Sequence, residues 1–186
     1  MYDASCDGCW VLRKDIAETR KWDSTNNDYK NSDIQAYLNG DWTSRYSAGV
    51  LSQIKQVKIP YVNGTGGSPV ASGANGLSCK IFLLSGYEVG FSTSDNSYFP
   101  RDGAKLSYFS SGTGSAANNK RIANYNGSAT GWWLRSPRTN YTLNIWQVQS
   151  DGDCDGAGYN RTYGVRPALV LPSSALVDDD LNVLAA

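Results

Sequence analysis

A short acidic segment near the C-terminus has the residue types and spacing of a calcium-binding loop. Asp151, Asp153 and Asp155 occupy every second position, and Gly156 follows them. Oxygen ligands at alternate positions, followed by a glycine that permits a sharp turn, are typical of the opening of a calcium loop. The bidentate acid expected at the last position is missing, because Thr162 stands there. The segment is therefore either an incomplete calcium site or the solvated acidic tip of a hairpin.

The four cysteines do not make up a recognisable metal site. Cys6 and Cys9 have the spacing of a zinc knuckle, but the sequence has no second pair of this kind and no histidine to complete a tetrahedral site. Cys79 begins an apolar segment and Cys154 lies in the acidic loop. We expect free thiols or one incidental disulfide, and we expect no cofactor and no structural metal.

The residue types available argue against an enzyme. The chain contains no histidine, which removes the commonest general base and every Ser-His or Cys-His arrangement. The glycine-rich segments 64–67 and 112–115 lack the lysine of a phosphate-binding loop. Nothing near the acidic segment would raise the pKa of one of its carboxyl groups for acid catalysis. The sequence therefore predicts a non-catalytic protein.

Charge and composition exclude further classes of partner. Lys+Arg and Asp+Glu number 17 each, so the net charge is zero and no basic surface for nucleic acid or an anionic membrane is expected. No apolar stretch has the length of a membrane span. The 19 glycines, 12 tyrosines and 6 tryptophans indicate a loop-rich domain with an aromatic core. We expect one domain over residues 1–172 and a solvated tail over 173–186.

Two helices are predicted in the first third of the chain. Ser32 has the position of a helix cap and Gln35 that of its capping-box partner, and Asn39-Gly40 ends the helix. A second helix is predicted over 50–57 from the helical spacing of its apolar residues. Residues 10–12 and 81–84 are predicted strands, and the polar stretch 92–130 is a predicted ordered loop with aromatic anchors.

The C-terminal part contains the strands that must position the acidic segment. Strands are predicted over 131–137, 143–150 and 164–171, with a turn at Asp151-Gly152. Strand alternation places two side chains of the middle strand toward the core and four on the opposite, exposed face. The core-facing pair is Trp146 and Val148, and the outward set is Leu143, Ile145, Gln147 and Gln149.

Arg135 and Arg166 lie in otherwise apolar strands and each precedes a proline within two positions. An arginine in such a strand must find acceptors, so each is expected to donate to backbone carbonyls or to a carboxylate. We interpret both as buried structural braces. An anion site that uses both arginines is the alternative.

Five motifs lie between about Trp10 and Pro172, namely SDIQAYLN at 32–39, KIFLLS at 80–85, WWLRSP at 132–137, SDG at 150–152 and GVRPAL at 164–169. Together they resemble an uncharacterised domain family that is widespread in gut bacteria and their phages. The family is similar to C-type-lectin folds of the formylglycine-generating-enzyme branch, although the cysteines of the catalytic branch have no evident counterpart in this chain. The resemblance implies an α+β, C-type-lectin-like fold, with two short helices packed on a small twisted antiparallel sheet and long ordered loops.

Some proteins of that family are variable proteins of diversity-generating retroelements, whose ligand-binding residues are rewritten by adenine-directed mutagenesis. Such rewriting reaches Asn, Asp, Tyr, Ser, Thr, Gly, Ala, Cys, Arg, Leu, Ile and a few other residues, but not Trp, Gln, Lys, Glu or Met. Segments 138–141 and 153–163 contain only reachable residues, whereas Trp146, Gln147 and Gln149 are outside this set. Any loop rich in glycine, aspartate and tyrosine would have the same composition without a retroelement.

The resemblance implies a non-enzymatic receptor-binding module on a phage tail or a bacterial cell surface. Tyrosines with adaptable polar neighbours, as in antibody loops, favour a protein or glycan receptor over a small molecule. A structural virion, tail or cell-surface domain and a carbohydrate-binding lectin are the alternatives, and a homo-oligomer is left open. The predicted ligand-binding residues, expected to be exposed on one face, are Arg138, Asn140, Tyr141, Gln147, Asp153, Asp155, Tyr159, Asn160 and Arg161.

Overall fold

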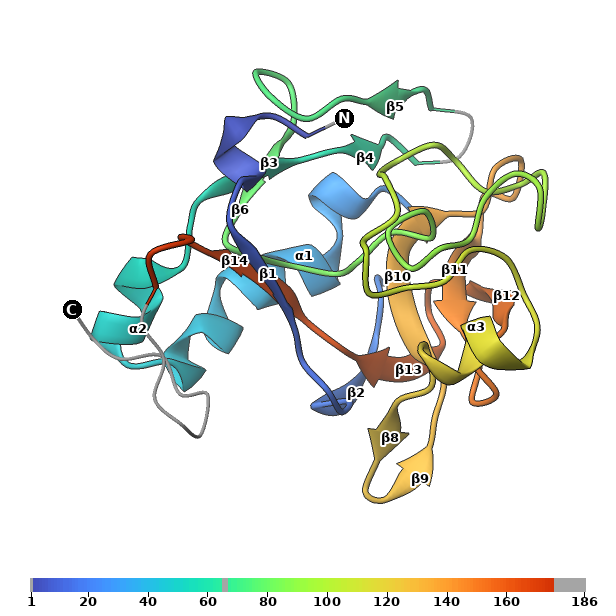
Figure 1. Ribbon diagram of the computed structural model, residues 1–186. Helices are drawn as coiled ribbons and strands as arrows, with labels where there is room; N and C mark the ends of the chain where they lie inside the picture. The colour runs from blue at the N-terminus through green and yellow to red at the C-terminus, as the bar shows by residue number, and fades with distance from the viewer. Residues whose placement is uncertain (1, 65–66, 176–186) are drawn as a thin grey trace.

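The computed structural model describes residues 2–64 and 67–175 and has an α+β fold of short helices and small sheets (Figure 1). Most of the tail expected over 173–186 lies outside the described residues. The helical elements are α1 Asp33–Asn39, α2 Ala48–Gln53 and α3 Ser115–Asn119, with the 3-10 turns η1 Ala4–Cys6, η2 Tyr29–Asn31 and η3 Asp41–Arg45. The strands are β1 Cys9–Leu12, β2 Glu18–Lys21, β3 Val57–Ile59, β4 Tyr61–Val62, β5 Pro69–Val70, β6 Leu77–Cys79, β7 Ile81–Phe82, β8 Asn124–Tyr125, β9 Ser128–Ala129, β10 Trp132–Pro137, β11 Asn144–Val148, β12 Cys154–Gly158, β13 Thr162–Val165 and β14 Ala168–Leu171.

The largest sheet has five strands in the order β12-β11-β10-β13-β2. Neighbouring strands are antiparallel except β10 and β13, which run parallel. The predicted strands over 131–137 and 143–150 correspond to β10 and β11. The acidic segment leads into β12, and Asn144 lies opposite Gly158 across the β11–β12 pair. The predicted return of the chain beside β11 is confirmed.

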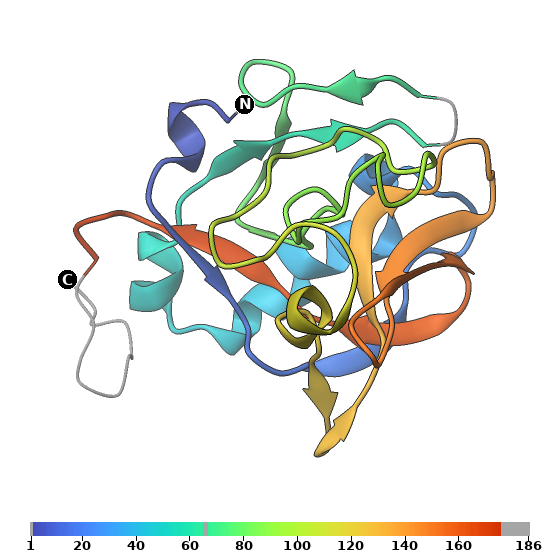
Figure 2. The same cartoon turned by 45° about the vertical axis from the view of Figure 1, so that its right-hand side comes forward.

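The prediction of one strand over 164–171 is wrong, because this segment contributes to two sheets. β13 pairs with β2 in the five-stranded sheet, whereas β14 lies between β1 and β7 in a three-stranded sheet. Between them, Pro167 has no N–H to donate to a sheet, and its carbonyl accepts from the N–H of Arg13 at 3.0 Å. Figures 1 and 2 show β10, β11 and β12 together on one side of the molecule and β1 beside β14 on another.

The first helix begins at the predicted cap. The Ser32 hydroxyl accepts from the backbone N–H of Gln35 at 3.2 Å, and the helix ends before Gly40. The reciprocal bond from Gln35 to the cap is not formed, because the N–H of Ser32 donates to the carbonyl of Tyr29. Gln35 is instead buried in the core.

The second helix is shorter than predicted and begins earlier. It spans Ala48–Gln53, and Val57 starts strand β3. The apolar residues spaced as one helical stripe therefore belong to two elements. Ile54 and Val57 are buried, whereas the helix itself has no fully buried residue.

Both faces of β10 are covered. Trp132 and Trp133 point to opposite sides of the strand, and both side chains are fully buried. Each indole N–H donates to a backbone carbonyl, from Trp132 to Arg121 and from Trp133 to Arg20, at 2.9 Å in both cases. On the face of Trp132, Trp146 of β11 stacks on Phe99 with the ring centroids 4.1 Å apart. The five-stranded sheet is thus a central layer of the core.

The polar stretch 92–130 is ordered, as predicted, and includes α3, β8 and β9. Phe99 and Phe109 are buried in the core. Arg121 connects this stretch to segments before and after it, since its guanidinium donates to the carbonyls of Val89, Gly112 and Gly152. Its N–H groups supply the hydrogen bonds that these loop carbonyls would otherwise lack.

Candidate ligand-binding surface

Arg138 is the centre of an aromatic and cationic cluster just beyond the end of β10. Its guanidinium carbon lies 4.2 Å from the ring centroid of Tyr141, 5.1 Å from that of Trp146 and 5.2 Å from that of Tyr98. Tyr98 and Tyr141 meet edge to face with their centroids 5.1 Å apart. These cation–π and aromatic contacts hold a normally flexible arginine in one place. We call Arg138, Tyr98 and Tyr141 the Arg138 cluster.

Two glycines of β12 make room beside this cluster. A Cβ at Gly156 would lie 2.8 Å from Cδ of Arg138, and a Cβ at Gly158 would lie 3.1 Å from Oδ1 of Asn160. Residues two apart on a strand share a face, so Arg138 and Asn160 lie on the same face of β12. Arg161 follows in the turn, where its N–H donates to the carbonyl of Gly158 at 2.9 Å. Asn160 and Arg161 are both exposed.

Two other predicted residues flank this face. Asn140 is exposed and has a φ of 67° in the turn between β10 and β11. Tyr159 is half-buried and packs partly against the core. Its carbonyl accepts from the N–H groups of Trp22 and Asp23, which fixes the backbone at the end of β12.

The two predicted aspartates do not join the Arg138 cluster. Asp155 is opposite Gln147 in the β11–β12 register, so its side chain lies on the other face of the strand from Gly156. The Asp155 carboxylate accepts from the N–H of Gly156 at 2.7 Å, and the Asp153 carboxylate accepts from the N–H of Cys154 at 2.8 Å. The prediction that all nine residues gather on one face is therefore wrong.

The acidic segment does not wrap around a common point, as a calcium loop would. It continues into strand β12 at Cys154, and the Asp151 carboxylate accepts from the N–H of Asp153 at 3.0 Å. Within residues 2–64 and 67–175, no group of three or more His, Cys, Asp or Glu side chains could hold a metal ion. The geometry favours the acidic hairpin tip.

The predicted exposure of Gln147 and Ile145 is wrong. Gln147 is only 4% exposed, and Ile145 is fully buried. Strand alternation assigns these side chains to the correct face, but that face is filled by neighbouring aromatic residues. Trp133 lies beside Gln147 in the β10–β11 register, and its ring contacts that of Tyr163 in β13 with the centroids 4.8 Å apart. Gln147 Oε1 is buried and accepts no hydrogen bond from the described part of the chain. Leu143, at the edge of the strand, is exposed as predicted.

Arg135 is a buried brace, as predicted. It forms an ion pair with Glu88 and donates to the carbonyls of Pro60, Leu83 and Asp102 at 2.8 to 3.0 Å. The Asp102 carboxylate accepts from the hydroxyl of Ser136 at 2.7 Å. Burial raises the pKa of Asp102 to about 6, although the Arg135 guanidinium acts in the opposite direction. These groups are sealed from solvent, which favours a structural role.

Two of the four thiols offer little nucleophilic chemistry. None of the four cysteines forms a disulfide. Burial raises the pKa of both Cys79 and Cys154 to about 12. Because the thiolate is the reactive form, these two side chains are inert near neutral pH.

Tyr98 is part of the surface that sequence reasoning did not assign to it. It lies in the long loop, far from Arg138 in the chain, and was predicted only as an aromatic anchor. Its carbonyl accepts from the N–H of Thr139 and from the indole of Trp146. A contact between segments this far apart leaves no local pattern, so only the structure reveals it.

Comparison with known proteins gives one family. A family model described as a domain of unknown function (DUF6273) matches residues 7–173. Neither the curated proteins nor the solved structures contain a match to the chain. Among the described residues, no helix has the length and apolar character needed to cross a membrane.

Proposed function

The chain belongs to the DUF6273 family of domains of unknown function, and we propose that it is a non-enzymatic module that binds a protein or glycan receptor. The binding surface is the Arg138 cluster together with Asn140, Asn160 and Arg161. In this proposal the module acts at a phage tail or a bacterial cell surface. Its fold is a C-type-lectin-like variant, and its surface is diversified by a retroelement.

One observation carries this proposal. Residues that adenine-directed rewriting cannot produce, Trp146 and Gln147, are buried in the sheet. Residues that it can produce, Tyr141, Asn160 and Arg161, are exposed at the adjoining strand ends. Substitution at exposed positions changes stability little, usually by about 0.5 kcal/mol or less. A surface with this arrangement can vary while the core stays constant.

The chemistry of the surface fits recognition of a large partner. Tyrosine and arginine are enriched among residues that dominate binding energy, and tyrosine supplies contact area with little loss of side-chain entropy. Arg138 is held by three rings, so little of its freedom remains to be lost on binding. The neighbouring asparagines supply hydrogen bonds that adapt to different partners.

Sister copies of the gene within one genome test the diversification. We expect their differences to concentrate at exposed positions of segments 138–141 and 153–163, while Trp146 and Gln147 stay constant. A reverse transcriptase and a template repeat should lie nearby. Differences spread evenly over the chain would contradict diversification and favour a structural domain whose surface packs on a neighbouring subunit.

Binding is tested with the labelled protein on intact gut bacteria and on an array of immobilised bacterial surface glycans and proteins. Tyr141→Ser and the pair Asn160→Ala with Arg161→Ser should reduce the signal at least tenfold. A matched control carries the same types of change on η3 and in the β5–β6 loop, Arg45→Ser with Asn75→Ala, and should bind like the wild type. Equal signals from folded variants and control would place the site elsewhere.

A further inference from the structure

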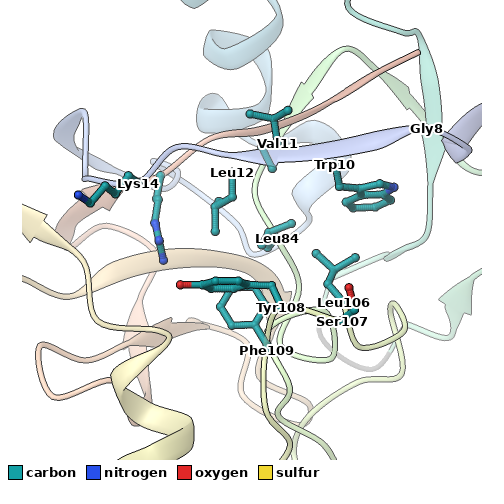
Figure 3. Close-up of a pocket in the computed structure, with 12 residues that line it drawn as sticks. Gly8, Trp10, Val11, Leu12, Lys14, Leu84, Leu106, Ser107, Tyr108 and Phe109 are labelled. Atoms are coloured by element: carbon teal, nitrogen blue, oxygen red, sulfur yellow. The ribbon is translucent and has the colours of Figure 1, made fainter. Parts of the chain in front are cut away.

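A second candidate site lies between β1 and the loop that contains residues 106–109. It is a cavity of about 530 Å³, a size common for pockets that take small molecules. Figure 3 shows Leu12 and Leu84 in the middle of the pocket, with Trp10 toward one end and Tyr108 and Phe109 below. Its walls are therefore largely aromatic and aliphatic.

The pocket also contains a buried cation that has no anionic partner among the described residues. Arg166 lines it and is only 5% exposed. Its Nε donates to the carbonyl of Arg13 at 2.8 Å, and its Nη1 lies 3.4 Å from the carbonyl of Arg121. Across the described residues, Arg166 forms no salt bridge and its Nη2 donates no hydrogen bond. Arg135, which is 1% exposed, has a carboxylate and three carbonyls as partners.

The charge of Arg166 is costly in this position. Burial lowers its pKa to about 10, and the attraction of Tyr108 and Asp15 only partly opposes this effect. A buried charge is normally paired, and an arginine is matched best by the two oxygens of a carboxylate. An anion entering the pocket would therefore fill the missing position.

A second cation stands at the rim. Lys14 is exposed and lines the same pocket. In Figure 3 the hydroxyl of Tyr108 points to the side of the pocket where Lys14 lies. Tyr108 is itself positioned by Lys120, whose ammonium group donates to the Tyr108 carbonyl at 2.9 Å. The pocket is thus lined by two cationic side chains, Arg166 and Lys14, and otherwise mainly by apolar groups.

We propose that this pocket binds a small aromatic carboxylate. The ring lies among Trp10, Leu12 and Phe109, where edge-to-face contacts favour an aromatic body over an aliphatic one. The carboxylate accepts from Arg166, with Lys14 adding attraction at the rim. This site shares no residue with the proposed receptor surface and does not depend on that proposal.

Indole-3-acetate is a suitable probe, measured by isothermal titration calorimetry on the whole chain. A ligand of this size in a formed pocket is expected to bind with a Kd of about 1 mM or tighter. The neutral analogue indole-3-ethanol should bind about tenfold more weakly or worse, and the cation tryptamine should not bind measurably. No heat with indole-3-acetate, or equal affinity for all three compounds, would overturn the proposal.

Variants locate the site. Arg166→Gln should abolish the preference for indole-3-acetate over indole-3-ethanol, and Arg166→Lys should retain part of it. Arg166 also donates to two loop carbonyls, so Arg166→Gln removes structural hydrogen bonds as well as the charge. Its melting temperature must therefore be measured alongside its affinity. If Arg166→Gln does not fold, Lys14→Gln and Tyr108→Ala replace it as test variants. Both change exposed positions, so they should weaken binding about threefold or more at an unchanged melting temperature. Lys21→Gln, an exposed lysine on β2, is the matched control. Affinity unchanged in every folded pocket variant would refute the assignment.

Discussion

The guanidinium of Arg135 and the carboxylate of Glu88 form a two-pronged ion pair inside the core, with Nη1–Oε2 at 2.5 Å and Nη2–Oε1 at 2.6 Å. Both side chains are completely buried. The hydroxyl of Tyr2 also donates to Glu88, and the N–H of Ser85 donates to it at 2.8 Å. The ion pair thereby connects the N-terminal segment, the loop after β7 and strand β10.

Breaking this pair should be strongly destabilising. Glu88→Gln leaves the Arg135 charge buried without a counter-ion, which typically lowers the free energy of unfolding by about 3–5 kcal/mol. Urea unfolding at pH 7 measures the change. Glu18→Gln is the control, because Glu18 pairs with Arg45 on the surface and such pairs contribute about 0–1 kcal/mol. An equal loss of unfolding free energy in the two variants would show that the buried pair contributes no more to stability than the surface pair.

The stability of the protein should depend on pH through Asp102, whose pKa burial raises to about 6. A carboxyl group with a raised folded-state pKa binds its proton more tightly in the folded state. Its contribution to stability is therefore full below the ordinary pKa of about 4 and is lost as the pH rises through about 6. The two pKa values imply a loss of about 3 kcal/mol across this window.

Asp102→Asn isolates this contribution from other titrating groups. Asparagine cannot ionise, so the free energy of unfolding of the variant relative to wild type should rise as the pH increases from 4 to 7. Urea titrations at pH 4, 5, 6 and 7 give the comparison. A difference that stays constant over this range would mean that Asp102 does not titrate there.

Both tryptophans of β10 should contribute to the stability of the fold to a similar degree. Trp132 and Trp133 are fully buried on opposite faces of the strand, and each donates an indole hydrogen bond. Replacing either one by alanine should lower the free energy of unfolding by about 3–5 kcal/mol. Thermal melting provides the test. A variant that melts like the wild type would show that its face of the sheet is not part of the core.

The amino-acid sequence predicted the local features of the fold and missed those that depend on distant contacts. The cap at Ser32, strands β10 and β11 and the brace at Arg135 follow from short patterns whose physical cause lies within a few residues. The split between β13 and β14 depends on which strands pair with each half, and nothing in the residues 164–171 themselves specifies those partners.

The candidate surface was predictable to a similar extent. Exposure was expected correctly for Tyr141, Asn160 and Arg161, because turn residues are normally on the surface. Gln147 was placed wrongly because alternation gives the face of a side chain but not what covers that face. The contribution of Tyr98 depends on a loop that returns from elsewhere in the chain, and no local spacing encodes such a return.

Gln147 offers a test of its buried position. Its Oε1 is buried without a hydrogen-bond partner from the described residues, and such a group costs about 1–3 kcal/mol relative to a satisfied one. Gln147→Met has a similar shape and no unsatisfied amide, so it should leave the free energy of unfolding unchanged or raise it by about 1 kcal/mol. A substantial loss in urea unfolding would show that the amide is satisfied in solution.

Gly156 controls the position of Arg138. A Cβ at Gly156 would lie 2.8 Å from Cδ and 3.0 Å from Nη1 of Arg138, which is closer than real contacts allow, so Gly156→Ala should displace the arginine from its three rings. The Nε–H resonance of Arg138, shifted by the ring currents of Tyr98, Tyr141 and Trp146, should move toward the value of a free arginine in a two-dimensional ¹H–¹⁵N spectrum. Gly156 and Arg138 are both half-buried and lie outside the hydrophobic core, so the melting temperature should change little. Gly127→Ala is a useful comparison, because a Cβ there meets nothing within 4 Å although its φ of +82° disfavours alanine. If the Arg138 resonance responds equally to both changes, backbone strain rather than the close approach at Gly156 governs the surface.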